Sequence, residues 1–569
     1  MKKIIIILFA FLSFTFITKA QESSCHLEKD SVKARLYHII GVLSHDSLKG
    51  REAGTEEELK AALFIKDIFT EIGLTSIFND GAYLQQFNIT DGILLGEDNY
   101  LLINNKPYKL MDDYFPINAS GSGKVSGEII KIGYGYVSLN KDYDDYEFYL
   151  NDASDKELKG KIFAIEMGIP PSVKDERIND ALNSIEGKVK LAIEKGASAV
   201  ILIKSDKDIV KPSLDMYRFE QPYTIPVIFA DQRAFKTIMD SNNSTADIAV
   251  TIEKNTKNAY NVIAYLDNNA PLTIVIGAHY DHLGYASPIS RHKGAPAIHP
   301  GADDNASGVS AMLELAKHLK CKNFTKYNVV FIAFSAEEKG LLGSGYFVKS
   351  EAYPLDKINY MLNLDMVGRV DTVEKKLTLI GTGTSPLWKT IIDKTKSDYL
   401  NIKISEPATG GSDHASFYVK DIPVIFFFSD LHEDYHKPTD VIEKINFEGI
   451  YNTVDYVLHL IDNSKSFEKL PYFKAATETS GSKRNSSVTL GIIPDHSYDG
   501  IGLRVSDVSA EKPAAKAGVL KGDIIIKIDD NDIRDIYSYM NALKLYKTGA
   551  KATVELERNK EIIKLNVVF

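Results

Sequence analysis

Residues 272–281, Leu-Thr-Ile-Val-Ile-Gly-Ala-His-Tyr-Asp, decide the fold because they join an apolar run to residues that can carry chemistry. The run Leu272–Ala278 has no polar alternation, which is typical of a strand covered on both faces in a mostly parallel sheet. His279 and Asp281 follow two residues apart, so on an extended chain their side chains point the same way. Alone, a His-x-Asp pair is more often a surface or capping feature than a metal site.

Further apolar runs of the same kind alternate with helical stretches. We therefore predict an α/β domain with a mostly parallel central sheet flanked by helices. Open α/β sheets bind ligands at the carboxyl ends of their strands. The runs are Val329–Phe334, Ile358–Leu364 and Pro423–Phe428, and the helical stretches include Gly308–Leu319 and Phe447–Ile461. The motifs that follow or lie beside the runs are Asp303-Asp304-Asn305, Glu337-Glu338, Asn363-Leu364-Asp365 and Tyr435-His436.

Each motif also has a structural explanation. Two adjacent acids before a helix are usually a cap, although a cap uses one acid and leaves the other unexplained. Glu337 and Glu338 are neighbours on one loop, so one can bind a metal while the other accepts a proton. The joint occurrence of these residue types at strand ends favours a metal site. Two zinc ions need a shared carboxylate, mixed nitrogen and oxygen ligands, and an open position for water.

The motifs, in this order and spacing, resemble the di-zinc aminopeptidase family, which includes secreted bacterial aminopeptidases, aminopeptidase Y and the glutamate carboxypeptidase II group. The resemblance implies that Asp304, four residues before Gly308, bridges two zinc ions. It implies the remaining metal ligands His279 and Asp365 for one zinc, and Glu338 and His436 for the other. It further implies Glu337 as general base and Tyr435 as a stabiliser of the tetrahedral intermediate. Asp281 is well placed to orient a ligand histidine.

Three other segments are harder to assign. Gly50-Arg51 with Gly54-Thr55 resembles the opening segment of the same family. Gly411-Ser412-Asp413-His414 also resembles a family segment near the site, without a definite role. His292 and His299 are read as polar loop groups or rim contacts.

The predicted function is hydrolysis of N-terminal residues from peptides, with Glu337 taking a proton from metal-activated water. Aminopeptidase activity is favoured because it is the commonest activity among the relatives. The alternatives are a dipeptidase or carboxypeptidase-like hydrolase, a one-zinc glutaminyl cyclase, and a non-catalytic peptide-binding protein. The complete two-metal set disfavours the last two.

Features outside the motifs limit location and partners. Lys2-Lys3, the apolar stretch Ile4–Ile17 and the small residue Ala20 predict a signal peptide, hence an exported protein that is periplasmic or secreted. A membrane anchor is the alternative, but the stretch is short for a bilayer span, and no other segment qualifies. A net charge of −10 without a basic cluster argues against nucleic acid. Cys25 and Cys321 are the only cysteines, which excludes a thiolate zinc site and leaves one bridge open.

At 569 residues the chain is too long for one core. An insert resembling a protease-associated domain is indicated by Leu158–Ile162, Gly196–Val200 and Ile225–Ile228. The C-terminal unit resembles a bacterial PDZ domain through Ile501–Val505, Pro513–Val519 and Lys521–Ile525. In that family the strand Gly502–Val505 offers its edge to an extended peptide. The predicted parts are a signal peptide (1–20), the N-terminal peptidase part (21–111), the insert (112–250), the catalytic domain (251–466), a linker (467–487) and the PDZ domain (488–569).

Overall fold

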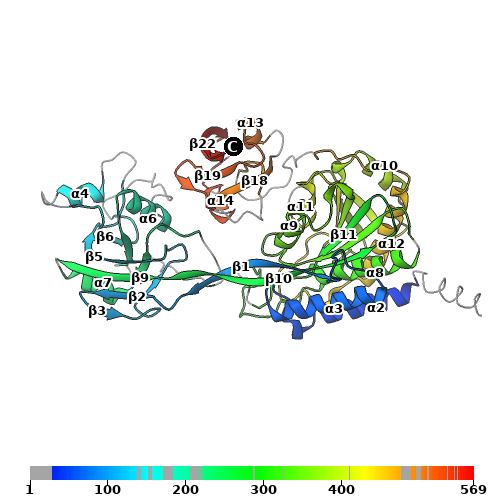
Figure 1. The fold of residues 1–569 in the computed structure, drawn as a ribbon, viewed down its shortest axis with the longest axis horizontal. Coiled ribbons are helices and arrows are strands. Elements are labelled where there is room, and N and C mark those ends of the chain that lie inside the picture. The colour runs from blue at the N-terminus through cyan, green and yellow to red at the C-terminus, as the bar shows by residue number, and fades with distance from the viewer. Residues whose placement is uncertain are drawn as a thin grey trace, which may run out of the picture. The chain divides into compact units, whose positions relative to one another are not determined.

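The structure is a computed structural model, and the fold is drawn in Figure 1. Within the described residues, no helix is both long enough and apolar enough to cross a bilayer. The predicted signal segment and Cys25 lie outside them. The described residues are 28–137, 143–151, 157–170, 184–204, 214, 216, 221–241, 243–285, 287, 289–322, 324–408, 411–475, 488–494, 501–508, 512–534, 536–543, 545–547 and 549–569.

The predicted apolar runs form the centre of an eight-stranded sheet with the order β1-β10-β12-β11-β13-β16-β14-β15. The neighbours β12, β11, β13 and β16 are parallel, while β10 and β14 join this centre antiparallel. Every residue of β11, β12 and β13 is buried, as their unbroken apolar sequences predict. The strands are β1 (Leu84–Leu95), β10 (Ile252–Leu266), β11 (Thr273–His279), β12 (Asn328–Phe334), β13 (Ile358–Leu364), β14 (Lys376–Ile380), β15 (Asn401–Ser405) and β16 (Val424–Phe428).

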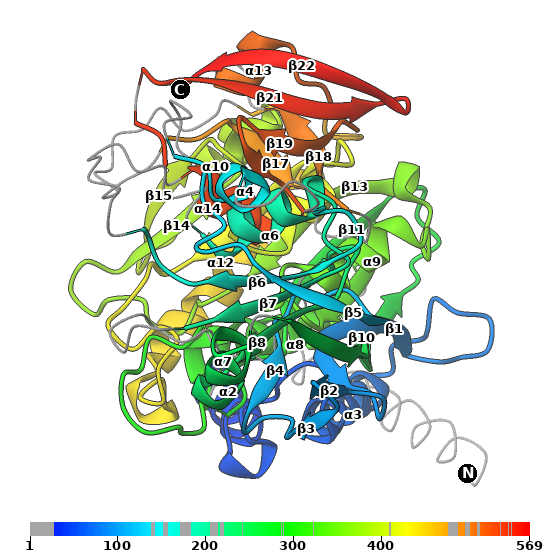
Figure 2. The ribbon, with the colours of Figure 1, turned by 90° about the vertical axis from the view of Figure 1, so that its left-hand side faces the viewer.

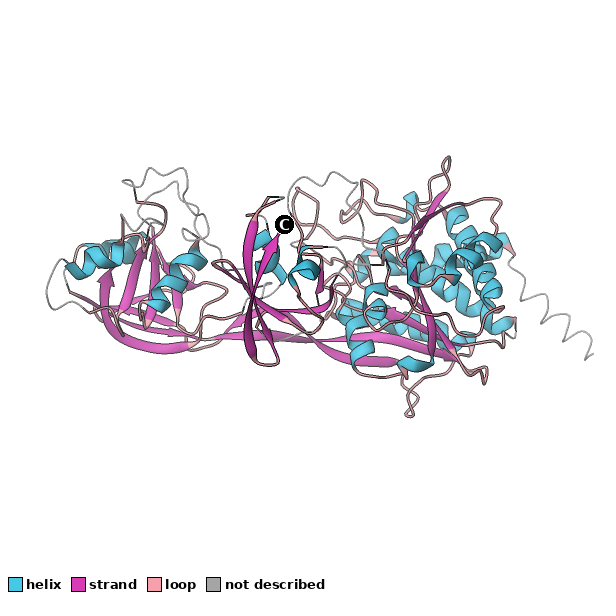
Figure 3. Ribbon diagram, turned by 90° about the horizontal axis from the view of Figure 1, so that it is seen from above, coloured by secondary structure: helices cyan, strands magenta, loops and turns pink. Residues whose placement is uncertain are grey.

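Helices cover both faces of this sheet, which explains why its central strands contain no polar alternation (Figure 3). One face packs against α2 (Lys29–Leu43), α3 (Glu56–Ile72), α8 (Gly308–Cys321), α10 (Leu387–Lys394) and α12 (Phe447–Ser464). The opposite face packs against α9 (Leu342–Lys349) and α11 (His414–Tyr418). The α/β architecture predicted from the sequence is thereby confirmed.

The helix α3 illustrates how local sequence sets these elements. Thr55 caps its start by accepting a hydrogen bond from the Glu58 amide, and Gly73 ends it in the left-handed conformation. Ala61, Ile65 and Phe69 lie on its buried face.

The predicted insert contains a second eight-stranded sheet, with the order β3-β2-β9-β5-β6-β7-β8-β4. Figure 2 labels its neighbouring parallel strands β5, β6, β7 and β8. The hairpin of β2 and β3 pairs with β9, so the predicted boundary at residue 111 is wrong: the insert sheet already begins at β2. The elements are β2 (Tyr100–Ile103), β3 (Lys106–Tyr108), β4 (Tyr114–Pro116), β5 (Gly123–Lys131), α4 (Asp145–Asn151), β6 (Ile162–Glu166), α6 (Ile185–Glu194), β7 (Ala199–Ile203), β8 (Val227–Ala230), α7 (Gln232–Met239) and β9 (Ser244–Val250).

The predicted linker starts too early. Leu470 is buried, and its amide donates to the Asn359 side chain at 2.7 Å. Residues 467–475 therefore continue the peptidase part, while 476–487 lie outside the described residues.

The C-terminal unit is β-rich, as predicted, with the strand order β17-β18-β19-β21-β22 and β20 paired to β19. The strand β18 carries Leu503–Val505 and has β17 on one side and β19 on the other. The strand β17 pairs with residues from Val505 to Val508, so it covers only the end of the segment expected to bind a peptide, and β17 is the terminal strand of the described sheet. The elements are β17 (Ile492–Pro494), β18 (Leu503–Val508), α13 (Pro513–Ala517), β19 (Ile524–Ile528), β20 (Asn531–Asp532), α14 (Ile536–Leu543), β21 (Lys551–Arg558) and β22 (Glu561–Val568).

Candidate metal centre

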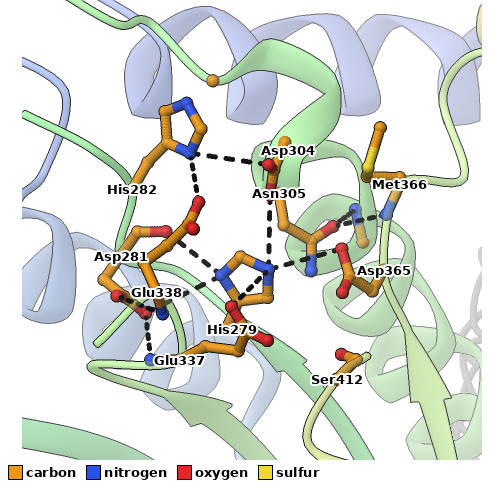
Figure 4. Close-up of polar contacts among 12 residues, drawn as sticks. His279, Asp281, His282, Asp304, Asn305, Glu337, Glu338, Asp365, Met366 and Ser412 are labelled. Carbon is orange, nitrogen blue, oxygen red and sulfur yellow. Dashed lines mark hydrogen bonds and ion pairs between the residues drawn. The ribbon is translucent and has the colours of Figure 1, made fainter. Parts of the chain in front are cut away.

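The predicted residues converge because parallel strands end at the same edge of the sheet. His279 is the last residue of β11 and pairs in register with Phe334, the last residue of β12. Glu337 and Glu338 follow three and four residues later, and Asp365 directly follows β13. His436 lies in the loop after β16. Figure 4 shows most of this cluster, in which no side chain is more than 13% exposed.

One group of ligand atoms surrounds the imidazole of His279. Its Nε2 lies 3.3 Å from Asp365 Oδ1 and 3.4 Å from Asp304 Oδ1. These three side chains are close enough together for one metal ion to bind all of them. His279, Asp304 and Asp365 thus form the first candidate position.

A second group surrounds the other oxygen of Asp304. The Oδ2 atom lies 3.4 Å from His436 Nε2, which in turn lies 3.2 Å from Glu338 Oε2. His282 also approaches, with Nδ1 2.8 Å from Glu338 Oε1 and 3.8 Å from Asp304 Oδ2. Asp304 therefore presents one oxygen to each group.

Asp303 does not take part in either group. Its Oδ1 accepts hydrogen bonds from Gly368 N at 2.6 Å and Ser307 Oγ at 2.9 Å, and its Oδ2 faces His432 Nε2 at 3.1 Å. The carboxylate is fully occupied by the surrounding loops. Of the two adjacent acids, only Asp304 contacts the other candidate ligands.

The loop that carries Asp304 is fixed by side chains that do not touch the ligand atoms. Asp440 accepts hydrogen bonds from the amides of both Asp303 and Asp304, at 3.0–3.1 Å. Asn305, which follows a cis peptide bond, accepts from Met366 N at 3.1 Å and donates to Leu364 O at 3.0 Å. These contacts set the direction of the Asp304 carboxylate.

Asp281 has a different principal contact from the one expected. His279 Nδ1 lies 3.1 Å from the backbone carbonyl of Asp281, nearer than the 3.7 Å to its Oδ1. The Asp281 carboxylate accepts hydrogen bonds from the amides of Glu337 and Glu338, at 3.1 and 3.3 Å. Its main visible role is to hold the two-glutamate loop against the end of β11.

Glu337 is the acid of the cluster with the weakest contacts. Its nearest contact within the two groups is 4.0 Å from Oε2 to His279 Nε2. Burial raises its pKa well above the usual value; His279 opposes this shift, while Glu338 and Asp365 reinforce it. A buried carboxyl with a raised pKa has the proton affinity of a general base.

Charge and donor type both fit a pair of zinc ions. Four carboxylates and three imidazoles meet in a buried space, and mixed oxygen and nitrogen donors suit zinc. Burial alone would lower the pKa of His436, yet Asp304 and Glu338 raise it to about 10. The cluster therefore stabilises positive charge, and a buried set of acids needs such charge.

Tyr435 stacks on His436, with ring centroids 3.8 Å apart. Burial raises the pKa of its hydroxyl, and the nearby Asp304 and Glu338 reinforce the shift. The phenol therefore stays protonated and can donate a hydrogen bond near the metal positions.

Arg51 lies beneath the centre and is completely buried. Its guanidinium donates to the carbonyls of Tyr280 at 2.8 Å, Pro300 at 2.6 Å and Gly301 at 3.1 Å, and also to Leu43. Burial lowers its pKa to about 10, so it remains charged at neutral pH. This one side chain joins the N-terminal segment to the loop that follows His279 and to the loop that precedes Asp304.

Three of these residues were missed or left without a role by sequence reasoning: His282, Asp440 and Arg51. His282 stands beside the predicted His279–Asp281 motif, and Asp440 follows His436 by four residues, so proximity to a motif was the available signal. Ser412, in the unassigned Gly411–His414 segment, accepts a hydrogen bond from Asn363 at 2.7 Å. His299 is a buried contact of Ser290, at 2.6 Å, rather than a rim residue, whereas His292 is exposed.

Comparisons with known proteins identify relatives of two regions of the chain. Residues 261–461 match peptidase family M28, and residues 480–568 match the PDZ domain. Aminopeptidase YwaD of Bacillus subtilis is 27% identical over 76% of this chain and 85% of its own length. A probable leucine aminopeptidase of Arthroderma otae is 30% identical over 40% of this chain and 62% of its own length. The solved structure of BSAP, a zinc aminopeptidase from Bacillus subtilis, is 25% identical over 76% of this chain and 95% of that chain, with a TM-score of 0.41.

Proposed function

Because residues 261–461 match peptidase family M28, we propose that the chain is an exported di-zinc aminopeptidase. The single observation that carries the proposal is the orientation of Asp304, whose two oxygens face two different sets of ligands. His279 and Asp365 would hold one zinc, and Glu338 and His436 the other. Asp304 would bridge them.

When bound, the zinc ions would lower the pKa of a water molecule and polarise the peptide carbonyl. The protein side chains account for the remaining requirements. Glu337, free of short contacts with the ligands, would take the proton from the attacking water and pass it to the leaving amine. The Tyr435 hydroxyl would donate to the oxyanion that develops on the substrate. The Asp281 carboxylate would keep Glu337 in place by accepting a hydrogen bond from the backbone amide of Glu337.

The other parts of the chain are assigned as proposals with narrower roles. We propose that residues 1–20 direct export and that the sheet from β2 to β9 is a protease-associated insert. The PDZ unit would bind an extended peptide along the edge of β17, the terminal strand of the described sheet. Among the residues that the structure describes, neither unit supplies a member of the two groups of possible metal ligands.

The decisive test compares the wild type with Glu337→Gln on aminoacyl chromogenic substrates. We expect turnover to fall by about 10²–10⁴-fold, because general-base catalysis contributes that much. The zinc-to-protein ratio should stay near two, since Glu337 is not a ligand. Glu433→Gln, an exposed acid in the His436 loop, is the matched control and should retain full turnover. Equal turnover in wild type and Glu337→Gln, or a zinc ratio near zero in the wild type, would rule out the proposal.

A further inference from the structure

His282 is the imidazole of the centre that the proposed ligand set does not use. Its side chain is completely buried, and its Nδ1 lies 2.8 Å from Glu338 Oε1. The other oxygen of that carboxylate, Oε2, lies 3.2 Å from His436 Nε2. The two oxygens of Glu338 are therefore divided between two imidazoles.

The contacts of His282 define which nitrogen carries its proton. Nδ1 faces an acceptor-only carboxylate, whereas Nε2 is buried without a hydrogen-bond partner among the described residues. A proton on Nε2 would leave a buried donor unpaired and would bring two acceptors together at Nδ1. The favoured tautomer is thus Nδ1–H, which donates to Glu338.

The ring has little freedom to turn away from this contact. A Cβ atom at Gly301 would lie 2.5 Å from His282 Cδ2, so the imidazole packs directly against the glycine backbone. Gly301 has a φ of +60°, and its carbonyl is held by Arg51 at 3.1 Å. The amide of His282 in turn donates to the carbonyl of Arg51 at 3.2 Å. Backbone and ring are fixed from both sides.

We propose that His282 is a positioning residue that fixes Glu338 by occupying Oε1, so that only Oε2 remains to bind the metal shared with Asp304 and His436. This inference rests on the proposed function, because it presupposes a metal at that position. His282, Asp304 and Glu338 also lie close enough together for one metal ion to bind all three, but the individual distances favour His436 over His282 as the ligand. His436 Nε2 lies at nearly equal distances from Glu338 Oε2 and Asp304 Oδ2, 3.2 and 3.4 Å. His282 Nδ1 lies 2.8 Å from Glu338 Oε1 but 3.8 Å from Asp304 Oδ2. The shorter of the latter is an ordinary hydrogen bond.

The test is zinc titration of the metal-free full chain by chelator competition, with bound zinc counted after dialysis. His282→Ala should lower the affinity for one of the two zinc ions by about 10–100-fold, the usual effect of losing a side chain that orients a ligand. The other zinc should keep its affinity. His282→Asn should bind zinc within about threefold of wild type, because its amide nitrogen can take the place of Nδ1 and donate to Oε1.

Two controls separate the outcomes. His318→Ala removes a buried His–Glu pair of similar length, 2.9 Å to Glu314, outside the centre, and should leave zinc binding unchanged. Asp304→Ala should abolish binding of both ions. If His282→Ala binds zinc like wild type, or if His282→Asn is as weak as His282→Ala, the positioning role is overturned; the second result would make His282 a ligand. If Asp304→Ala still binds two zinc ions, the proposed function fails instead.

Discussion

Replacing Asp440 with alanine tests whether the loop that carries Asp304 must be held in shape for metal binding. The Asp440 carboxylate accepts hydrogen bonds from the amides of Asp303 and Asp304 at 3.0–3.1 Å and is itself buried. Asp440 belongs to neither group of candidate ligands found among the described residues. Any loss of zinc in Asp440→Ala therefore reports the position of Asp304 rather than a missing ligand.

The size of the effect follows from the number of bonds. Hydrogen bonds to a charged group contribute about 1.5–3 kcal/mol each, so two lost bonds set an upper limit of about 3–6 kcal/mol. The loop will recover part of this free energy by moving its amides toward other acceptors. We expect the remainder to appear as a 10–100-fold loss of zinc affinity, which corresponds to about 1.4–2.7 kcal/mol. Asp440→Asn should lose less, because its amide oxygen can stand where Oδ2 accepts from both amides.

Chelator competition measures the loss of zinc affinity, and a thermal melt of the metal-free protein measures the loss of stability. Asp371 is the matched control, since it also accepts two backbone amides, from Val373 and Glu374 at 2.7 Å, but is exposed. Asp371→Ala should bind zinc like wild type. The reasoning is refuted if Asp440→Ala also binds zinc like wild type, or if Asp440→Asn is weaker than Asp440→Ala.

Three further predictions follow from the structure. Asp304→Ala should empty the centre, whereas Asp303→Ala should lower the melting temperature but keep some zinc; the opposite pattern in metal analysis would place the bridge at Asp303. Burial raises the pKa of Glu58 to about 7, so its contribution to stability is present below about 4.5 and lost as the pH rises through 7. Glu58→Gln should therefore gain in melting temperature over wild type between pH 5 and 8, and parallel curves would contradict this. Deletion after Ser487 should leave hydrolysis of short aminoacyl substrates largely unchanged, and a collapse of turnover would show that the PDZ unit shapes the active site.

The sequence predicted the central sheet and the convergence of the candidate ligands because both depend on local signals. Unbroken apolar runs identify buried parallel strands, and the polar residue after each run is carried to the shared edge. The orientation of Asp281 was not predictable, because backbone and side-chain oxygens compete for His279 over a few tenths of an ångström. Arg51 was unassigned because its acceptors lie up to 250 residues away along the chain.

The predicted domain boundaries were wrong for a related reason. The hairpin of β2 and β3 is short, and nothing in its own residues indicates which of two sheets it joins. The strand β17, which covers part of β18 in the PDZ unit, has only three residues and gave almost no sequence signal. Pairing partners are a long-range property, which periodicity within one strand does not encode.

The position of Arg51 has a consequence for the order in which the enzyme matures. Its guanidinium binds carbonyls that are synthesised only after the entire insert, and the final loop with His436 and Asp440 comes later still. An emerging chain therefore contains Arg51 long before it contains the carbonyls that Arg51 binds or the loop that completes the centre. We expect the peptidase to become active only when nearly the whole catalytic domain has left the ribosome.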